Sequence, residues 1–141
     1  MYAQLRNAAT EAAHKAYAPY SKFHVGAAVR LETGEIITGN NQENAAYPSG
    51  LCAERVAIFY ANAQYPNSRI THLMICAETE GEVLKKPITP CGACRQVIIE
   101  KENTQGAPIE ICLAGADETF VLPSASDLMP LSFVSDSLIN K

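Results

Sequence analysis

Two short stretches decide how this chain folds: Cys52-Ala53-Glu54 and Pro90-Cys91-Gly92-Ala93-Cys94. Each opens a segment in which apolar residues recur at helical spacing, and each follows a segment whose composition is typical of a loop. We therefore predict one helix over residues 52–63 and a second that begins near Cys91 and runs out at residues 101–103. Both helices begin at or beside a cysteine.

The segments around these helices predict strands on both sides. We expect an amphipathic helix over residues 3–17 that ends at Pro19, a hairpin of strands over 23–31 and 35–38, and single strands over 73–77, 109–114 and 119–122. Only residues 115–118 separate the last two strands. Parallel neighbours need a crossover of a dozen or more residues, so this pair should be antiparallel.

Helices that alternate with strands predict an α/β fold. We expect three layers, α/β/α, around a mixed five-stranded sheet whose last two strands are antiparallel. The length of 141 residues fits one ordinary domain, so we predict a single domain over residues 1–141.

Composition and charge narrow the classes of function. The chain is 48% hydrophobic and 18% charged, which is typical of a compact soluble protein. Its formal net charge of −4 argues against a nucleic-acid partner, which would favour an excess of lysine and arginine. No apolar run approaches the ~18 residues of a membrane span, and the N-terminus does not resemble a signal peptide. We expect a cytoplasmic protein with a small substrate and no membrane partner.

The predicted helix over residues 52–63 is unusual because almost none of its surface is polar. It should be largely buried. Glu54 and Arg55 are its only charged residues, and burial of an unpaired charge is costly. Their place at the start of an apolar helix therefore hints at a functional role.

The cysteines point to a metal rather than to disulfides. There are five, an odd number, and three of them fall into the two motifs. Cys91 and Cys94 share one face of a helical turn, which by itself fits a redox disulfide and half of a structural zinc site equally well. Cys52 and Glu54 point to different sides of an ideal helix. Both can serve one centre only if two helix N-termini meet it end-on.

Three thiolates on Zn²⁺ would leave one tetrahedral position open and an excess negative charge. Arg55 is placed to offset that charge, with Arg95 as the second candidate. The three histidines lie in no tight motif, so a fourth protein ligand is not evident. Glu54 then fits a group that moves protons at a water molecule rather than a ligand. Three cysteines, a non-ligand glutamate and a downstream Pro-Cys-x-x-Cys are the arrangement of the zinc-dependent base deaminases.

At these residues the chain resembles the cytidine deaminase family, in its small homotetrameric form. The resemblance covers roughly residues 17–133. It rests on Ala18-Pro19-Tyr20-Ser21-Lys22-Phe23, Val25-Gly26-Ala27-Ala28, Asn41-Gln42-Glu43-Asn44-Ala45-Ala46-Tyr47, Cys52-Ala53-Glu54-Arg55 and Pro90-Cys91-Gly92-Ala93-Cys94-Arg95-Gln96.

The resemblance implies site residues beyond the metal ligands Cys52, Cys91 and Cys94 and the catalytic Glu54. Asn41 and Glu43 would hold the ribose hydroxyls, which explains the polar segment over residues 40–51. Phe23 would pack against the pyrimidine, and Ala53 would contact the substrate. Phe133 would reach the site of a neighbouring subunit in a homotetramer.

The expected function is zinc-dependent hydrolytic deamination of cytidine, 2′-deoxycytidine or both to the uridine product plus ammonia, as in pyrimidine salvage. Three alternatives remain. The nearest is a deaminase with another substrate, such as one resembling the blasticidin S deaminases. The others are a noncatalytic binding protein with a structural zinc site, and a redox protein in which Cys91 and Cys94 form a reversible disulfide.

Overall fold

The computed structural model describes residues 1–139. In chain order the elements are α1 (Tyr2–His14), β1 (Phe23–Leu31), β2 (Ile36–Asn40), the 3₁₀ turn η1 (Tyr47–Ser49), α2 (Ala53–Gln64), β3 (Ile70–Thr79), β4 (Glu82–Val83), α3 (Gly92–Gln105), β5 (Glu110–Ala114), β6 (Thr119–Leu122), the 3₁₀ turn η2 (Ala125–Leu128) and α4 (Asp136–Ile139). Within these residues, every helix is too short or too polar to cross a membrane.

The strands form one mixed sheet in the order β2-β1-β3-β5-β6, and the short β4 pairs with the end of β3. Only β3 and β5 run parallel among the described strand pairs. The pairing of β5 with β6 is antiparallel, with Ala114 opposite Thr119, which confirms the prediction from their short connection. The expected five strands form the main order, and β4 is a sixth.

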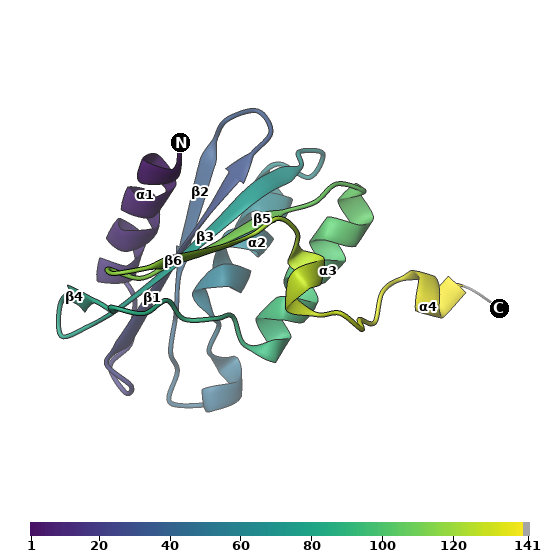
Figure 1. Cartoon of the computed structure of the whole chain (residues 1–141). Helices are drawn as coiled ribbons and strands as arrows, with labels where there is room; N and C mark the ends of the chain where they lie inside the picture. The colour runs from purple at the N-terminus through teal and green to yellow at the C-terminus, as the bar shows by residue number, and fades with distance from the viewer. Residues whose placement is uncertain (140–141) are drawn as a thin grey trace.

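The sheet lies between two layers of helix, which confirms the predicted α/β/α architecture. Figure 1 shows α1 on one face of the sheet and α2 and α3 on the other. Because neighbouring residues of a strand point to opposite faces, β1 contributes Ala27 and Val29 to the core beneath α2 and α3, and Ala28 to the smaller core beneath α1. The two cores together fix the sheet between its helices.

Helix α1 ends at His14, three residues before the position expected from the periodicity of its apolar residues. The chain leaves the helix because the backbone N–H of Tyr17 donates to the carbonyl of Asn41, 3.0 Å away. A tertiary hydrogen bond therefore replaces the last turn. It draws the loop after α1 towards the segment that follows β2.

Helix α2 is less buried than its apolar sequence predicts. Its inner face, with Ala57 and Ile58, is buried against the sheet. Phe59 and Tyr60, however, are 46% and 53% exposed. The expectation of a largely buried helix is therefore wrong for the outer face, which presents aromatic surface to the exterior of this chain.

Gly39 in β2 lets the start of α2 approach the sheet closely. A Cβ at this position would lie 2.6 Å from the carbonyl oxygen of Ala53 and 2.5 Å from the backbone nitrogen of Ala57. Such distances are too short for real contacts, so only glycine permits this approach. The first turn of α2, which carries Glu54, is thereby held against the sheet.

Candidate metal centre and active site

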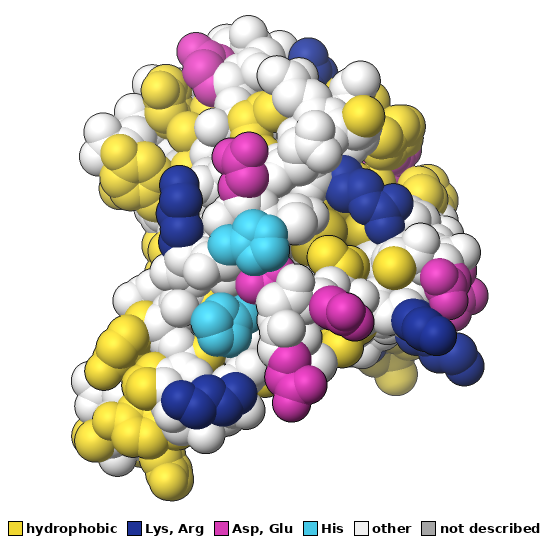
Figure 2. Space-filling view, turned by 90° about the vertical axis from the view of Figure 1, so that its left-hand side faces the viewer, with side chains coloured by type: hydrophobic (Ala, Val, Ile, Leu, Met, Phe, Trp, Pro, Cys, Tyr) yellow, Lys and Arg dark blue, Asp and Glu magenta, His cyan; other side chains and the backbone are white. Residues whose placement is uncertain are grey.

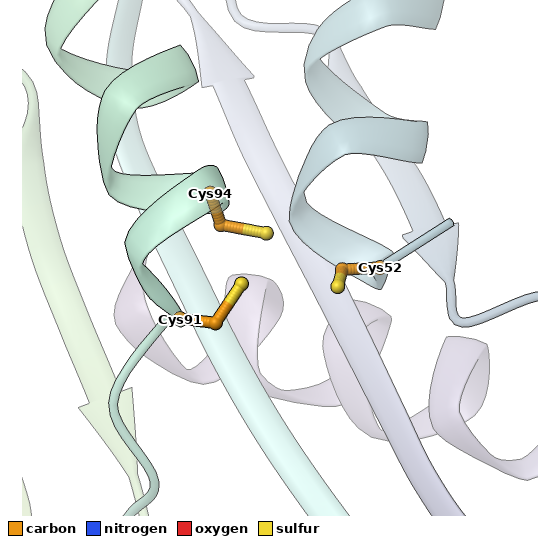
Figure 3. Close-up of side chains that lie close together, drawn as sticks. All are labelled: Cys52, Cys91 and Cys94. Carbon is orange, nitrogen blue, oxygen red and sulfur yellow. The ribbon is translucent and has the colours of Figure 1, made fainter. Parts of the chain in front are cut away.

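Three thiols meet where the N-termini of α2 and α3 converge. The sulfur atoms of Cys52, Cys91 and Cys94 all lie within 4.8 Å of one another, and they are the only group of this kind among residues 1–139. Figure 3 shows the three side chains, from the two helices, pointing into one space. All five cysteines are free thiols. The structure thus brings together the three cysteines that the motifs singled out.

The backbone at Cys52 explains how it can share a centre with Glu54. Cys52 is the N-cap of α2 and has an extended conformation, with φ −73° and ψ 153°. It therefore stands outside the regular helix, and the opposing directions expected on an ideal helix do not apply. Cys91 is likewise the extended N-cap of α3, while Cys94 lies in its first turn. Both helices meet the three sulfurs end-on.

The donor set fits a thiophilic dication. Burial raises the pKa of the Cys94 thiol, and the negative charges of Glu54 and Cys52 raise it further. Burial also opposes ionisation of Cys91, but backbone N–H groups of Cys94 and Ala93 lower its pKa overall. Three crowded thiolates need a compensating positive charge, and Zn²⁺ prefers sulfur ligands in such a geometry. The cluster is therefore a group that can hold zinc.

Arg55 and Arg95 have different partners, although each follows closely on a cysteine motif. Arg55 donates from Nη2 to the Cys52 sulfur at 3.4 Å, and this hydrogen bond is the main cause that raises the pKa of Arg55. Arg95 instead donates from Nε to the Pro90 carbonyl at 2.8 Å and from Nη1 to the Leu128 carbonyl at 2.9 Å. The structure therefore places Arg55, the first candidate, at the sulfurs.

Glu54 is a buried carboxylic acid beside the sulfur cluster. Its side chain belongs to a residue that is 4% exposed, and its Oε2 lies 3.6 Å from the Cys94 sulfur, which donates to it. Burial raises the pKa of Glu54 above that of an ordinary carboxyl group. A shift in this direction brings the pKa of a carboxyl group closer to that of an effective general acid and base.

A cavity of about 570 Å³ opens next to Cys52 and has the size of a small-molecule site. Its lining combines polar side chains with apolar surface and comes from three segments of the chain. The lining residues are Tyr20, Ser21, Asn41, Gln42, Glu43, Asn44, Tyr47, Gly50, Leu51, Cys52 and Arg55. The structure therefore brings the predicted sugar residues, Asn41 and Glu43, into the same cavity as the first cysteine.

A small backbone ladder sets the distance between the sugar residues and the metal cluster. Gln42 pairs in parallel with Tyr17 on one side and antiparallel with Leu51 on the other. The bonds between Gln42 and Leu51 are both 2.9 Å long. Since Leu51 directly precedes Cys52, this ladder ties the polar segment after β2 to the start of α2.

The other predicted substrate residues lie at different depths. Phe23, the first residue of β1, is partly buried and packs against the core beneath α2 and α3. Ala53 is fully buried in the first turn of α2. Phe133 is 59% exposed and lines a separate groove with Phe59 and Val97, so the single chain does not bring it to the cavity beside Cys52.

Sequence reasoning gave no role to Ser21, although the structure places it at the cavity. Its hydroxyl donates to Glu43 Oε2 and accepts from the backbone N–H of Phe23 at 3.0 Å. The second bond is a local turn that a serine two residues before a strand can make, and this is the one signal in the sequence. The contact with Glu43 joins distant segments and has no local signature.

Comparison with known proteins agrees with this arrangement. The family described as "Cytidine and deoxycytidylate deaminase zinc-binding region" matches residues 2–105. A cytidine deaminase of Sporosarcina psychrophila is 43% identical over 130 residues, which cover 89% of this chain and 91% of that protein. A blasticidin-S deaminase of Bacillus cereus is 31% identical over 115 residues, which cover 80% and 79% of the two chains.

Solved structures extend the similarity to the fold. The crystal structure of cytidine deaminase from Burkholderia pseudomallei has a TM-score of 0.81 and 40% sequence identity to this chain. The match covers 94% of this chain and 99% of the other. With matching motifs, sulfur cluster and topology, this chain belongs to the cytidine deaminase family.

Proposed function

We propose that the chain catalyses the zinc-dependent hydrolytic deamination of cytidine, 2′-deoxycytidine or both, to the uridine product plus ammonia. The observation that carries this proposal is the buried Glu54, whose carboxylate lies 3.6 Å from the Cys94 sulfur in a cluster of three thiols. A structural zinc site would gain nothing from a buried acid at this place. A hydrolytic site requires one.

The roles of the groups follow from their positions. When bound, zinc supplies Lewis acidity that lowers the pKa of water towards neutrality. Glu54 takes a proton from the water that adds to C4 of the pyrimidine and transfers it to the ring nitrogen N3. The second proton of that water also passes through Glu54 to the amino group, which leaves as ammonia. Cytidine and water are thus converted to uridine and ammonia with no other reactant.

The surrounding residues hold the metal and the substrate. Cys52, Cys91 and Cys94 are the proposed ligands, and Arg55 offsets the excess negative charge through its bond to the Cys52 sulfur. Asn41 and Glu43 hold the ribose hydroxyls from the lining of the cavity. Phe23 and Ala53 contact the pyrimidine side.

The proposal also includes the domain organisation, the location and the substrate class of the enzyme. We infer a single domain over residues 1–141 that acts in the cytoplasm, in pyrimidine salvage, on a free nucleoside rather than on a nucleic acid. The formal net charge of −4 supports a free nucleoside rather than a nucleic acid as substrate. Figure 2 shows basic side chains dispersed among acidic ones on the side where α1 lies.

Association into a homotetramer is part of the proposal. The exposed aromatic residues of α2, Phe59 and Tyr60, support burial of that helix between copies of the chain. Phe133 would then reach the site of a neighbouring copy.

Supplying purified protein with cytidine, 2′-deoxycytidine, cytosine and adenosine, and following ammonia release together with zinc content, tests the reaction. We expect ammonia from one or both cytosine nucleosides. No ammonia from either by a zinc-loaded protein would refute the proposal. A blasticidin-type deaminase would require neither Asn41 nor Glu43, so a substitution there would leave its activity intact.

The catalytic role of Glu54 has a matched control within the chain. Glu54→Gln removes the proton-carrying group and should lower kcat at least about a hundredfold while zinc content stays at the wild-type level. Glu78 is equally buried, at 4% exposed, but contacts His14 and does not line the cavity beside Cys52. Glu78→Gln should therefore retain turnover. Equal losses in the two variants would contradict a specific role for Glu54.

A further inference from the structure

Ser21 connects two parts of the chain at the edge of the cavity. Its hydroxyl donates to Glu43 Oε2, and the Ser21 Oγ also accepts the backbone N–H of Phe23 at 3.0 Å. Ser21 lies in the loop before β1, whereas Glu43 follows β2. One hydroxyl group therefore fixes the side chain of Glu43 relative to the first residue of β1.

Three hydrogen bonds from this loop already hold the carboxylate of Glu43. Its Oε1 accepts the backbone N–H groups of Tyr20 at 3.0 Å and Ser21 at 3.1 Å, and its Oε2 accepts the Ser21 hydroxyl. A carboxylate offers about four acceptor positions, so about one is left for a donor in the cavity. The Ser21 hydroxyl is also the largest cause that lowers the pKa of Glu43 below its usual range. The group thus remains an ionised acceptor.

The loop that carries Ser21 has a fixed and uncommon shape. Lys22 has a φ of 58°, in the left-handed region that residues other than glycine rarely adopt. Its backbone N–H donates to the Ala18 carbonyl at 3.0 Å, which closes the turn. A strained turn of this kind persists only where its surroundings hold it, and the bonds to Glu43 do so here.

Asn41, the other proposed sugar residue, is tied to the same place. Its Oδ1 accepts the backbone N–H of Val25 at 2.8 Å, and its Nδ2 donates to the Phe23 carbonyl at 2.9 Å. One N–H and one acceptor position of the amide remain for a ligand. Both sugar residues are thus oriented by the segment from Tyr20 to Val25, but only Glu43 depends on a side-chain hydroxyl.

We propose that Ser21 is a positioning residue that orients the Glu43 carboxylate and thereby sets the preference for nucleosides that carry ribose hydroxyls. Ser21 does not act on the reacting atoms. Its effect reaches the substrate through Glu43 alone, so it changes the binding of the sugar rather than the chemical step. The inference rests on the proposed nucleoside substrate and on the sugar contact proposed for Glu43.

The test compares a substrate with a competitor that lacks the relevant groups. Cytidine is assayed for KM and kcat, and 2′,3′-dideoxycytidine is assayed as a competitive inhibitor. Ser21→Ala should raise KM for cytidine about tenfold, the value of one hydrogen bond to a charged group, and leave kcat and the inhibition constant of the dideoxynucleoside near wild type. Ser21→Thr, which keeps the hydroxyl, should restore KM. Ser68→Ala, in the turn between α2 and β3, serves as the control.

A double-mutant cycle separates the two proposals. Glu43→Ala should weaken cytidine binding, and adding Ser21→Ala to it should cause no further loss, because Ser21 acts through Glu43. If Glu43→Ala weakens cytidine binding but Ser21→Ala does not, or if Ser21→Ala weakens both nucleosides equally, the inference about Ser21 is overturned and the proposed function stands. If the wild-type enzyme deaminates no cytosine nucleoside, both fall together.

Discussion

Two arginines show how strongly the surroundings of a residue determine its role. Arg55 lies in the first turn of α2 and Arg95 in the first turn of α3, and each stands one residue after a residue proposed for the site. Arg55 meets a sulfur, whereas Arg95 meets two backbone carbonyls. Arg55 Nε is buried without a hydrogen-bond partner among the described residues, so the guanidinium is held there chiefly for its charge.

Matched substitutions should separate these two roles. Arg55→Gln removes the charge beside the thiolates and should lower kcat about tenfold, because the metal then carries an uncompensated negative charge. Arg95→Gln should chiefly lower the free energy of unfolding, by about 1–2 kcal/mol, since two carbonyls lose their donor. Steady-state kinetics and urea unfolding of both variants check this. A larger loss of kcat in the Arg95 variant would reverse the assignment.

At this scale the sequence could predict the residues whose chemistry is local. The spacing of Cys91 and Cys94, and the acid two residues after Cys52, define a metal centre before any coordinates are known. Ser21 could not be predicted, because its decisive partner, Glu43, is brought to it by the fold. The role of Phe133, which would require a neighbouring copy of the chain, stays a prediction.

At the scale of elements, the position of α2 determines the geometry of the centre. The helix begins directly after the extended Cys52 and lies against β2 at Gly39. The ladder from Tyr17 through Gln42 to Leu51 fixes the chain just before it. The start of α2 is therefore held by backbone contacts from two sides, which leaves its side chains free for the site.

Adding a side chain at Gly39 should lower the free energy of unfolding and displace the start of α2, which carries the site. In Gly39→Ala the added Cβ would clash with backbone atoms of Ala53 and Ala57, which cannot rotate away. We expect a loss of about 2 kcal/mol in the free energy of unfolding, measured by urea denaturation. Gly92→Ala is the control, because a Cβ there meets nothing within 4 Å. If the two variants unfold at the same urea concentration, α2 can move away from β2 without loss of stability, which would contradict this prediction.

Elements with a simple pattern were predicted well, and elements set by tertiary contacts were not. The bounds of β6, Thr119–Leu122, agree with the expected strand, and β5 differs by one residue. β3 extends well beyond the expected 73–77, because its polar ends pair with β1 and β4. β4 itself has only two residues, too few for any periodicity, although the turn before it at Gly81 has a positive φ of 82°.

At the scale of the whole molecule, the sulfur cluster joins two helices that have few other contacts with each other. Cys52 belongs to the start of α2, and Cys91 and Cys94 belong to α3. A metal held by all three would cross-link these helices on the same face of the sheet (Figure 1). Binding of such a metal is coupled to folding, because the unfolded chain lacks the assembled site.

Removal of zinc should therefore lower thermal stability as well as activity. Zinc in thousandfold excess over its dissociation constant contributes about 4 kcal/mol. A strong chelator should thus lower the melting temperature by roughly 10 °C, and added zinc should restore it. Differential scanning calorimetry measures both steps. In Cys52→Ala, which lacks one ligand, the chelator should have a much smaller effect. A wild-type melting temperature that does not change as zinc leaves would contradict the cross-link.

The overall architecture was predictable because its main constraint is topological. A connection of four residues, 115–118, forces β5 and β6 into an antiparallel pair, and alternating helices and strands require helices on the sheet faces. The shape of the cavity could not be predicted from the sequence, because its lining combines segments around Tyr20, Glu43 and Cys52 that meet only in the folded chain.

Side chains of α3 hold several backbone groups of the segment after β6. Arg95 and Gln96 donate to the carbonyls of Leu128 and Phe133, and Glu102 accepts the N–H groups of Ala125 and Ser126. Backbone carbonyls, and the N–H groups of every residue except proline, are the same whatever the side chain. Mutations that accumulate along this segment, as at the 91% exposed Leu131, can therefore alter what the surface presents without changing the path of the chain.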